Sequence, residues 1–113
     1  MTKRKKPPNR PDWLEAVLTA LDPLGEITSR AMFGGYAIYQ RGRIFALAGN
    51  GRLYLKADEQ TEGDFRARGM GPFQPWEGLT LKSYFEVPPD VLGDPEALRA
   101  WAAESILASL RLG

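Results

Sequence analysis

The 113-residue chain contains no histidine and no cysteine. Histidine is the side chain that most often moves protons near neutral pH, and cysteine supplies thiol nucleophiles and disulfides. Both residues are also common ligands of transition metals. Their absence counts against proton-shuttle catalysis, thiol chemistry and most transition-metal sites. We therefore expect a protein that is not an enzyme, with no catalytic residue, no metal site and no cofactor.

Long hydrophobic runs are also missing. No apolar stretch approaches the ~20 residues that a membrane-spanning helix needs. The first residues, Met1 to Lys6, are followed by prolines and not by the apolar segment of a signal peptide. The absence of cysteine neither requires nor excludes an oxidising compartment. We expect a cytoplasmic protein that does not contact a membrane.

Positive charge is concentrated at the start of the chain. Five cations and no acid lie in the first ten residues, whereas the remaining residues hold 10 bases and 14 acids, a net charge of −4. The five cations are Lys3, Arg4, Lys5, Lys6 and Arg10. Prolines at positions 7, 8 and 11 disfavour a helix, so we predict a disordered basic arm over 1–11 and one domain over 12–113. Contact between this arm and DNA phosphates is one hypothesis for function.

Apolar periodicity and turn signals predict the elements of the domain. In chain order these are a helix over 13–21, strands over 28–40, 44–48 and 53–57, a helix over 59–68, strands over 73–76 and 81–87, and a helix over 95–111. Asp12, Asp58 and Asp94 are the predicted N-caps of the three helices. Asn50-Gly51 is a strong hairpin signal. Gly34-Gly35, inside the first predicted strand, indicates a bulge or the close approach of another backbone.

Several segments, in this order and spacing, resemble the N-terminal domain of the TfoX/Sxy competence regulators. They are Arg30-Ala31-Met32-Phe33-Gly34-Gly35-Tyr36, Gly42-Arg43-Ile44-Phe45-Ala46-Leu47, Arg52-Leu53-Tyr54-Leu55-Lys56-Ala57-Asp58, Phe65, Gly69-Met70, Pro72-Phe73 and Tyr84-Phe85-Glu86-Val87-Pro88. The resemblance covers about residues 10 to 112. It implies an α+β, two-layer fold in which an antiparallel sheet of about five strands packs with helices, in the order α-β-β-β-α-β-β-α, similar to secretion chaperones.

The same resemblance implies a role in activating bacterial competence genes together with a transcription activator of the cyclic-AMP receptor type. No enzymatic activity, and hence no cofactor, is attached to such domains. The sequence lacks the C-terminal helical domain of the full regulators. A stand-alone relative with a different protein partner is therefore the alternative interpretation.

Residues that could support catalysis are isolated. Glu86 is the only carboxylate on its predicted strand face, beside Lys82 and Tyr84, and Ser83 has no histidine to activate it. The Gly34-Gly35 pair is not followed by the Lys-Ser/Thr of a phosphate-binding loop. These patterns favour a binding module over an enzyme.

Aromatic residues are too numerous for one buried face of the sheet. Either the outer face is partly open and presents tyrosines and cations to a partner, or a second helix layer covers it. A protein partner is the first choice and single-stranded nucleic acid the second. The residues that we predict to bind a partner are Arg30, Tyr39, Arg52, Tyr54, Lys56, Lys82 and Tyr84. We expect a monomer or a weak homodimer.

Overall fold

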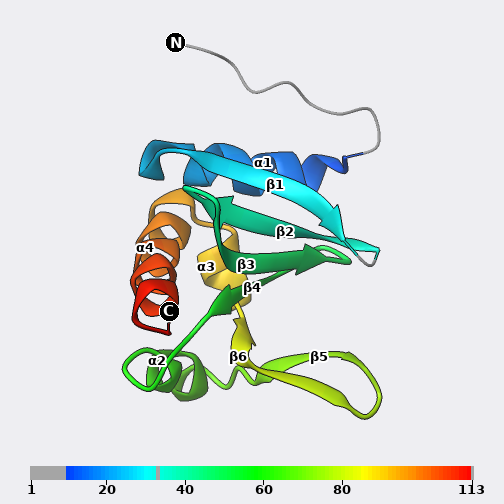
Figure 1. Ribbon diagram of the computed structural model, residues 1–113, viewed down its shortest axis with the longest axis vertical. Helices are drawn as coiled ribbons and strands as arrows, with labels where there is room; N and C mark the ends of the chain where they lie inside the picture. The colour runs from blue at the N-terminus through cyan, green and yellow to red at the C-terminus, as the bar shows by residue number, and fades with distance from the viewer. Residues whose placement is uncertain (1–9, 33, 113) are drawn as a thin grey trace.

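The computed structural model of the chain describes residues 10–32 and 34–112, and Figure 1 shows a curved sheet with helices against it. The helices are α1 (Asp12–Leu21), α2 (Glu62–Ala67), α3 (Pro89–Leu92) and α4 (Pro95–Leu112), and the 3₁₀ turn η1 (Asp22–Leu24) follows α1. The strands are β1 (Ile27–Met32), β2 (Gly35–Gln40), β3 (Arg43–Gly49), β4 (Arg52–Lys56), β5 (Pro72–Trp76) and β6 (Leu79–Glu86). All pairings are antiparallel, in the order β1-β2-β3-β4-β6-β5. The predicted α+β fold is confirmed, with six strands where about five were expected.

The main core lies between the helices and one face of the sheet. Helix α4 packs on β3 and β4 and against α1 and α3, and Figure 1 shows α1 behind β1 and α3 behind β3 and β4. Strand register places Ile38, Ala46, Leu55 and Phe85 opposite one another across four strands, and all four are fully buried. Apolar residues of α1 and α4 complete this core: Leu14, Val17, Leu18, Leu21, Leu98 and Ala102. The Ser105 hydroxyl fixes α4 to β3 by donating a hydrogen bond to the carbonyl oxygen of Phe45 at 2.9 Å.

The first predicted strand is in fact a hairpin of two strands. Met32 pairs with Gly35, and Gly34 has a φ of +81°, a conformation that glycine adopts without strain. Of the two alternatives predicted for Gly34-Gly35, the structure does not show the bulge, because β1 and β2 pair in continuous register up to Gly35. The predicted close approach is confirmed, because a Cβ added to Gly35 would lie 2.5 Å from the carbonyl oxygen of Ala48 on β3.

The other two predicted hairpins of the meander are confirmed. Asn50 and Gly51 have φ values of +53° and +75°, and Arg41 and Gly42 have φ values of +53° and +78°. Two successive residues at positive φ are typical of the type I′ turn that joins tightly twisted strands. The two turns therefore fix the β2–β3–β4 meander.

Helix ends were predicted with mixed success. Asp94 is the N-cap of α4, since its Oδ1 accepts hydrogen bonds from the backbone N–H groups of Glu96 and Ala97. Asp12 is not a cap, because Pro11 occupies that position and no side chain caps α1. Asp58 is also not a cap, because α2 starts later than predicted, with Thr61 at its N-cap position. The short helix α3 was not predicted.

Asp58 instead holds the loop before α2 in place. Its carboxylate accepts hydrogen bonds from the Gln60 N–H and the Thr61 hydroxyl. Arg111, near the end of α4, donates to the same carboxylate through Nε at 2.5 Å. The arginine holds the pKa of Asp58 down to about 2, compared with an ordinary value of 3.8. This ion pair connects two elements that lie 53 positions apart in the sequence.

Candidate partner-binding face

The open face of the sheet, opposite the main core, carries six of the seven residues predicted to bind a partner. Arg30 pairs with Ala37, Ala37 with Leu47, Leu47 with Tyr54, and Lys56 with Tyr84. Directly opposed residues of an antiparallel pair point to the same side, and so do residues two positions apart along a strand. Tyr39 and Arg52 therefore join this face. Alternation does not place Lys82 there, because its neighbour Leu81 pairs with Phe73 in the irregular part of the β5–β6 ladder, and the Phe73 ring stacks on Tyr54 of this face. The prediction that the seven residues contact a partner stays a prediction.

Two of the predicted tyrosines are covered. Tyr54 is 9% exposed and Tyr84 is 8% exposed, yet neither is part of the main core. The ring of Tyr54 stacks on Phe73 of β5, with ring centroids 3.9 Å apart. The expectation of an exposed tyrosine patch was therefore wrong for these two rings. The other predicted alternative was a second helix layer over this face. Tyr54 is covered not by a helix but by the ring of Phe73, which belongs to the β5–β6 hairpin.

Burial raises the pKa of both phenols further above neutrality. The pKa of Tyr54 is raised, first by burial and then by the charge of Glu86, while Arg52 opposes the change. The pKa of Tyr84 is also raised, mainly by burial, with a further contribution from Tyr39. Neither group is therefore prepared to act as an acid near neutral pH. Their rings provide apolar surface.

Cations of the open face lie above two tyrosine rings, those of Tyr84 and Tyr39. The Lys56 ammonium lies 5.2 Å from the centroid of the Tyr84 ring, and the Arg30 guanidinium lies 5.9 Å from that of Tyr39. Arg52 forms an ion pair with Glu86 at 3.5 Å. By strand alternation, the described strands place three cations on the open face, Arg30, Arg52 and Lys56, against the single carboxylate of Glu86. The face is therefore positive, whereas residues 11–113 together carry a charge of −4.

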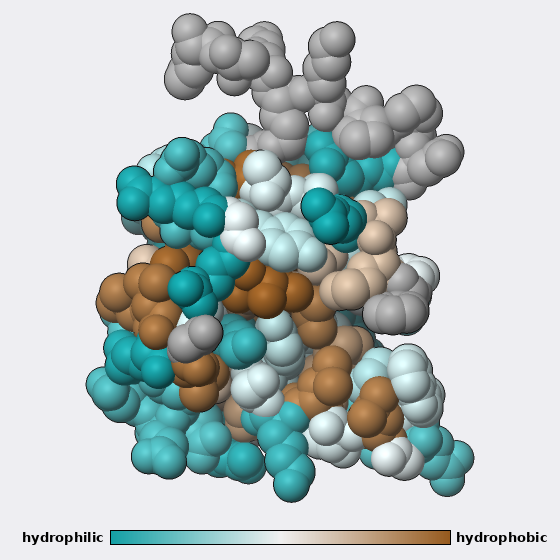
Figure 2. Space-filling view, in the orientation of Figure 1, coloured by the Kyte–Doolittle hydropathy of each residue, from teal (hydrophilic) through white to brown (hydrophobic). Residues whose placement is uncertain are grey.

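A groove of about 590 Å³ lies between the β3–β4 turn and the β5–β6 hairpin. Its apolar lining includes Leu47, Tyr54, Phe73, Trp76, Leu79 and Leu81, and Arg52 and Asn50 supply polar groups. Trp76 is 61% exposed. Figure 1 shows the hairpin projecting beyond the rest of the sheet, and Figure 2 shows hydrophobic side chains over it. This groove, which we call the hairpin groove, was not predicted from the sequence.

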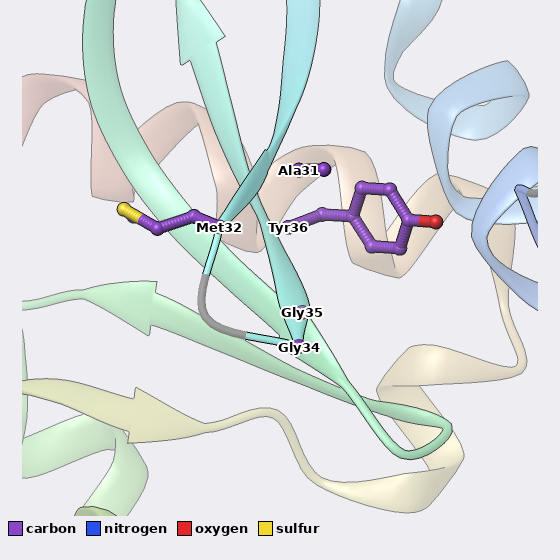
Figure 3. A pocket seen from close by; sticks show the side chains of 5 residues that line it. All are labelled: Ala31, Met32, Gly34, Gly35 and Tyr36. Carbon is purple, nitrogen blue, oxygen red and sulfur yellow. The ribbon is translucent and has the colours of Figure 1, made fainter.

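A smaller hollow of about 360 Å³ lies at the β1–β2 hairpin. Its lining residues are Ala31, Met32, Gly34, Gly35 and Tyr36. In Figure 3 the side chains of Met32 and Tyr36 extend to opposite sides of this hairpin. Met32, Gly34, Gly35 and Tyr36 also line the hairpin groove. The two hollows therefore meet at the β1–β2 turn.

Of the predicted nucleic-acid arm, only Arg10 lies within the described residues. Its guanidinium donates hydrogen bonds to the Glu15 carboxylate and, at 2.8 Å, to the Ser29 hydroxyl. The side chain is 9% exposed. Arg10 thus belongs to the folded domain and is not free for phosphate contact, which corrects its assignment to the arm. The cations Lys3, Arg4, Lys5 and Lys6 lie outside the described residues.

Among residues 10–32 and 34–112, the structure contains no group of three or more acidic side chains arranged to hold a metal ion. Glu86, the carboxylate considered for catalysis, is engaged by Arg52.

No helix in the described part of the chain is both long enough and apolar enough to cross a membrane.

Comparison with known proteins agrees with this fold. The family model described as the TfoX N-terminal domain matches residues 19–109. The chain is also 30% identical over 66 residues to the DNA transformation protein TfoX1 of Aliivibrio fischeri (strain ATCC 700601 / ES114). That match includes 57% of this chain and 32% of the relative, so the similarity spans about a third of the relative's length. Because the family model matches most of its length, the chain belongs to the TfoX N-terminal domain family.

Proposed function

We propose that the chain is a non-catalytic binding module that contacts a protein partner through the open face of its sheet. The main observation in support is the distribution of charge. Three cations on one sheet face contrast with the net negative charge of residues 11–113. Complementary potentials guide partners to one face and discriminate against wrong partners.

Family membership and the name of the matched relative, a DNA transformation protein, support a link to bacterial DNA competence. We propose that the partner is a component of the transcription machinery for competence genes, such as an activator. The isolated and engaged carboxylate of Glu86 supports a role without catalysis. The contact between a basic arm and DNA stays a prediction for Lys3, Arg4, Lys5 and Lys6.

Charge reversal on the open face tests the proposal. Arg30 is exposed and Lys56 is half-buried on this face, so Arg30→Glu with Lys56→Glu changes the potential of the face without altering a residue of the main core. The matched control is Arg41→Glu with Arg66→Glu, which makes the same charge change at two exposed arginines of a turn and of α2. Affinity capture from a lysate, followed by mass spectrometry, should recover a partner with the wild type and the control but lose it with the open-face variant.

The competence link has its own readout. In a bacterium that carries the gene, deletion should lower the uptake of marked DNA, and the control allele should restore it while the open-face allele should not. Equal capture and equal uptake with both double variants would contradict the proposal.

A further inference from the structure

The hairpin groove has the form of a site for part of a polypeptide. Its volume, about 590 Å³, falls within the range of roughly 300–1,000 Å³ that ligand sites in proteins show. The stacked rings of Tyr54 and Phe73 contribute to its lining, and Leu79, Leu81 and Trp76 of the β5–β6 hairpin contribute further apolar surface. Water in contact with these side chains is released when an apolar ligand binds.

The charge beside the groove selects the ligand further. Arg52 lines it and is 61% exposed, and its pairing with Glu86 at 3.5 Å leaves it available to a second carboxylate. Lys56 lies on the same sheet face. The residues at the start of this chain, with Lys3 to Lys6, carry the same sign of charge as this surface. They would be repelled, so the occupant must come from another molecule.

Single-stranded nucleic acid also carries negative charge, but it binds such proteins by stacking bases on exposed rings. Tyr54 and Tyr84 are covered, and the Lys56 ammonium lies over the ring of Tyr84. Among the large hydrophobic side chains that the structure describes, Trp76 is the only aromatic one with more than half of its surface exposed. The groove thus offers apolar volume for side chains and few ring faces for bases.

We propose that the hairpin groove binds a short segment of a partner protein in which acidic residues adjoin apolar ones, the apolar side chains entering the groove and a carboxylate pairing with Arg52. This inference rests on the proposed function and specifies the ligand of the same face. It assigns a binding role to Trp76, Leu79 and Leu81, which the sequence pattern did not identify.

Selection from a random peptide library tests the proposal and does not require the partner to be identified first. Phage displaying random 12-residue peptides are panned against the full chain and, in parallel, against the bare support. The expected enriched peptides combine Asp or Glu with Leu, Phe or Trp. A fluorescein-labelled synthetic copy of the most enriched peptide is then titrated with the wild type and with variants, with fluorescence anisotropy as the readout.

Two matched pairs of variants locate the binding site. Trp76→Ser and Arg52→Glu should each weaken peptide binding by about tenfold or more, because exposed aromatic and arginine side chains are the usual energetic centres of interfaces. Leu110→Ser on α4 and Arg66→Glu on α2 should leave it unchanged. Leu110, at 55% exposed, is comparable with Trp76. Arg66 is 57% exposed and pairs with one glutamate at 3.9 Å, so its exposure and its ion pair resemble those of Arg52.

The outcomes separate the two proposals. No enrichment over the support, enrichment of peptides without acidic residues, or equal losses in all four variants would overturn the peptide groove. A 20-residue oligothymidine that displaces the peptide, and that binds in an Arg52-dependent way, would assign the surface to nucleic acid and also overturn it. If panning fails while Arg30→Glu with Lys56→Glu still abolishes partner capture, the groove proposal falls and the proposed function stands.

Discussion

Replacing Gly35 with alanine should destabilise the domain, because the added methyl group meets the backbone of the next strand. Its Cβ would lie 2.5 Å from the carbonyl oxygen of Ala48, whereas ordinary contact begins at 3.4 Å. The obstacle is main chain and cannot rotate away, so β2 and β3 must separate near the Tyr36–Ala48 pair. Overpacking costs about 1–3 kcal/mol, and one weakened backbone hydrogen bond adds about 1 kcal/mol. The expected loss in the free energy of unfolding is therefore about 2–4 kcal/mol.

Thermal and urea unfolding, followed by circular dichroism, measure this loss. Each kcal/mol lowers the melting temperature of a domain of this size by about 4 °C, so a decrease of about 8–16 °C is expected. Gly63→Ala is the matched control, since Gly63 lies in α2 with nothing within 4 Å of an added Cβ. Alanine there should stabilise the protein by up to about 1 kcal/mol. A melting temperature of Gly35→Ala equal to that of the wild type, or an equal decrease in both variants, would refute the steric argument.

Two further predictions concern helix ends and pH. Asp94→Ala should lower the free energy of unfolding by about 1 kcal/mol through loss of the α4 cap, and Asp94→Asn, which keeps the capping oxygen, should lower it much less. The urea unfolding midpoints of both variants measure these losses. Equal losses in the two variants would contradict the capping role of Asp94. The pKa of Asp58 is lowered to about 2 in the folded state, so its ion pair with Arg111 stabilises the fold above the unfolded pKa of about 3.8 and is lost as the pH falls toward 2. Urea midpoints should therefore fall more steeply between pH 4 and pH 2 in the wild type than in Asp58→Asn, and parallel profiles would exclude this contribution.

Local patterns were sufficient for the elements that local chemistry determines. The type I′ turns and the Asp94 cap with Pro95 behind it were predictable, because each depends on a few adjacent residues. The alternation of strand residues was also enough to gather six of the seven predicted partner-binding residues on one face, and it failed at Lys82, where the β5–β6 register is irregular.

Long-range contacts determined the rest. The Asp58 carboxylate is held by Arg111, which no local rule pairs with it, and so the start of α2 was placed too early. The burial of Tyr54 involves Phe73, which lies on β5, beyond β6, in a part of the sheet where the register of β5 and β6 is irregular. The hairpin groove follows from the same packing. Its residues could not be assigned to a site from spacing alone.

The two outermost strands of the sheet differ in how they could accept a neighbour. Strand β5 contains Pro72 and Pro75 and register shifts near both ends; prolines lack the N–H that an incoming strand would need. Strand β1 contains no proline. Growth of the sheet by addition of further copies is thus blocked on one side, so self-association through strand pairing would stop at a closed two-fold pair and could not propagate into a fibre.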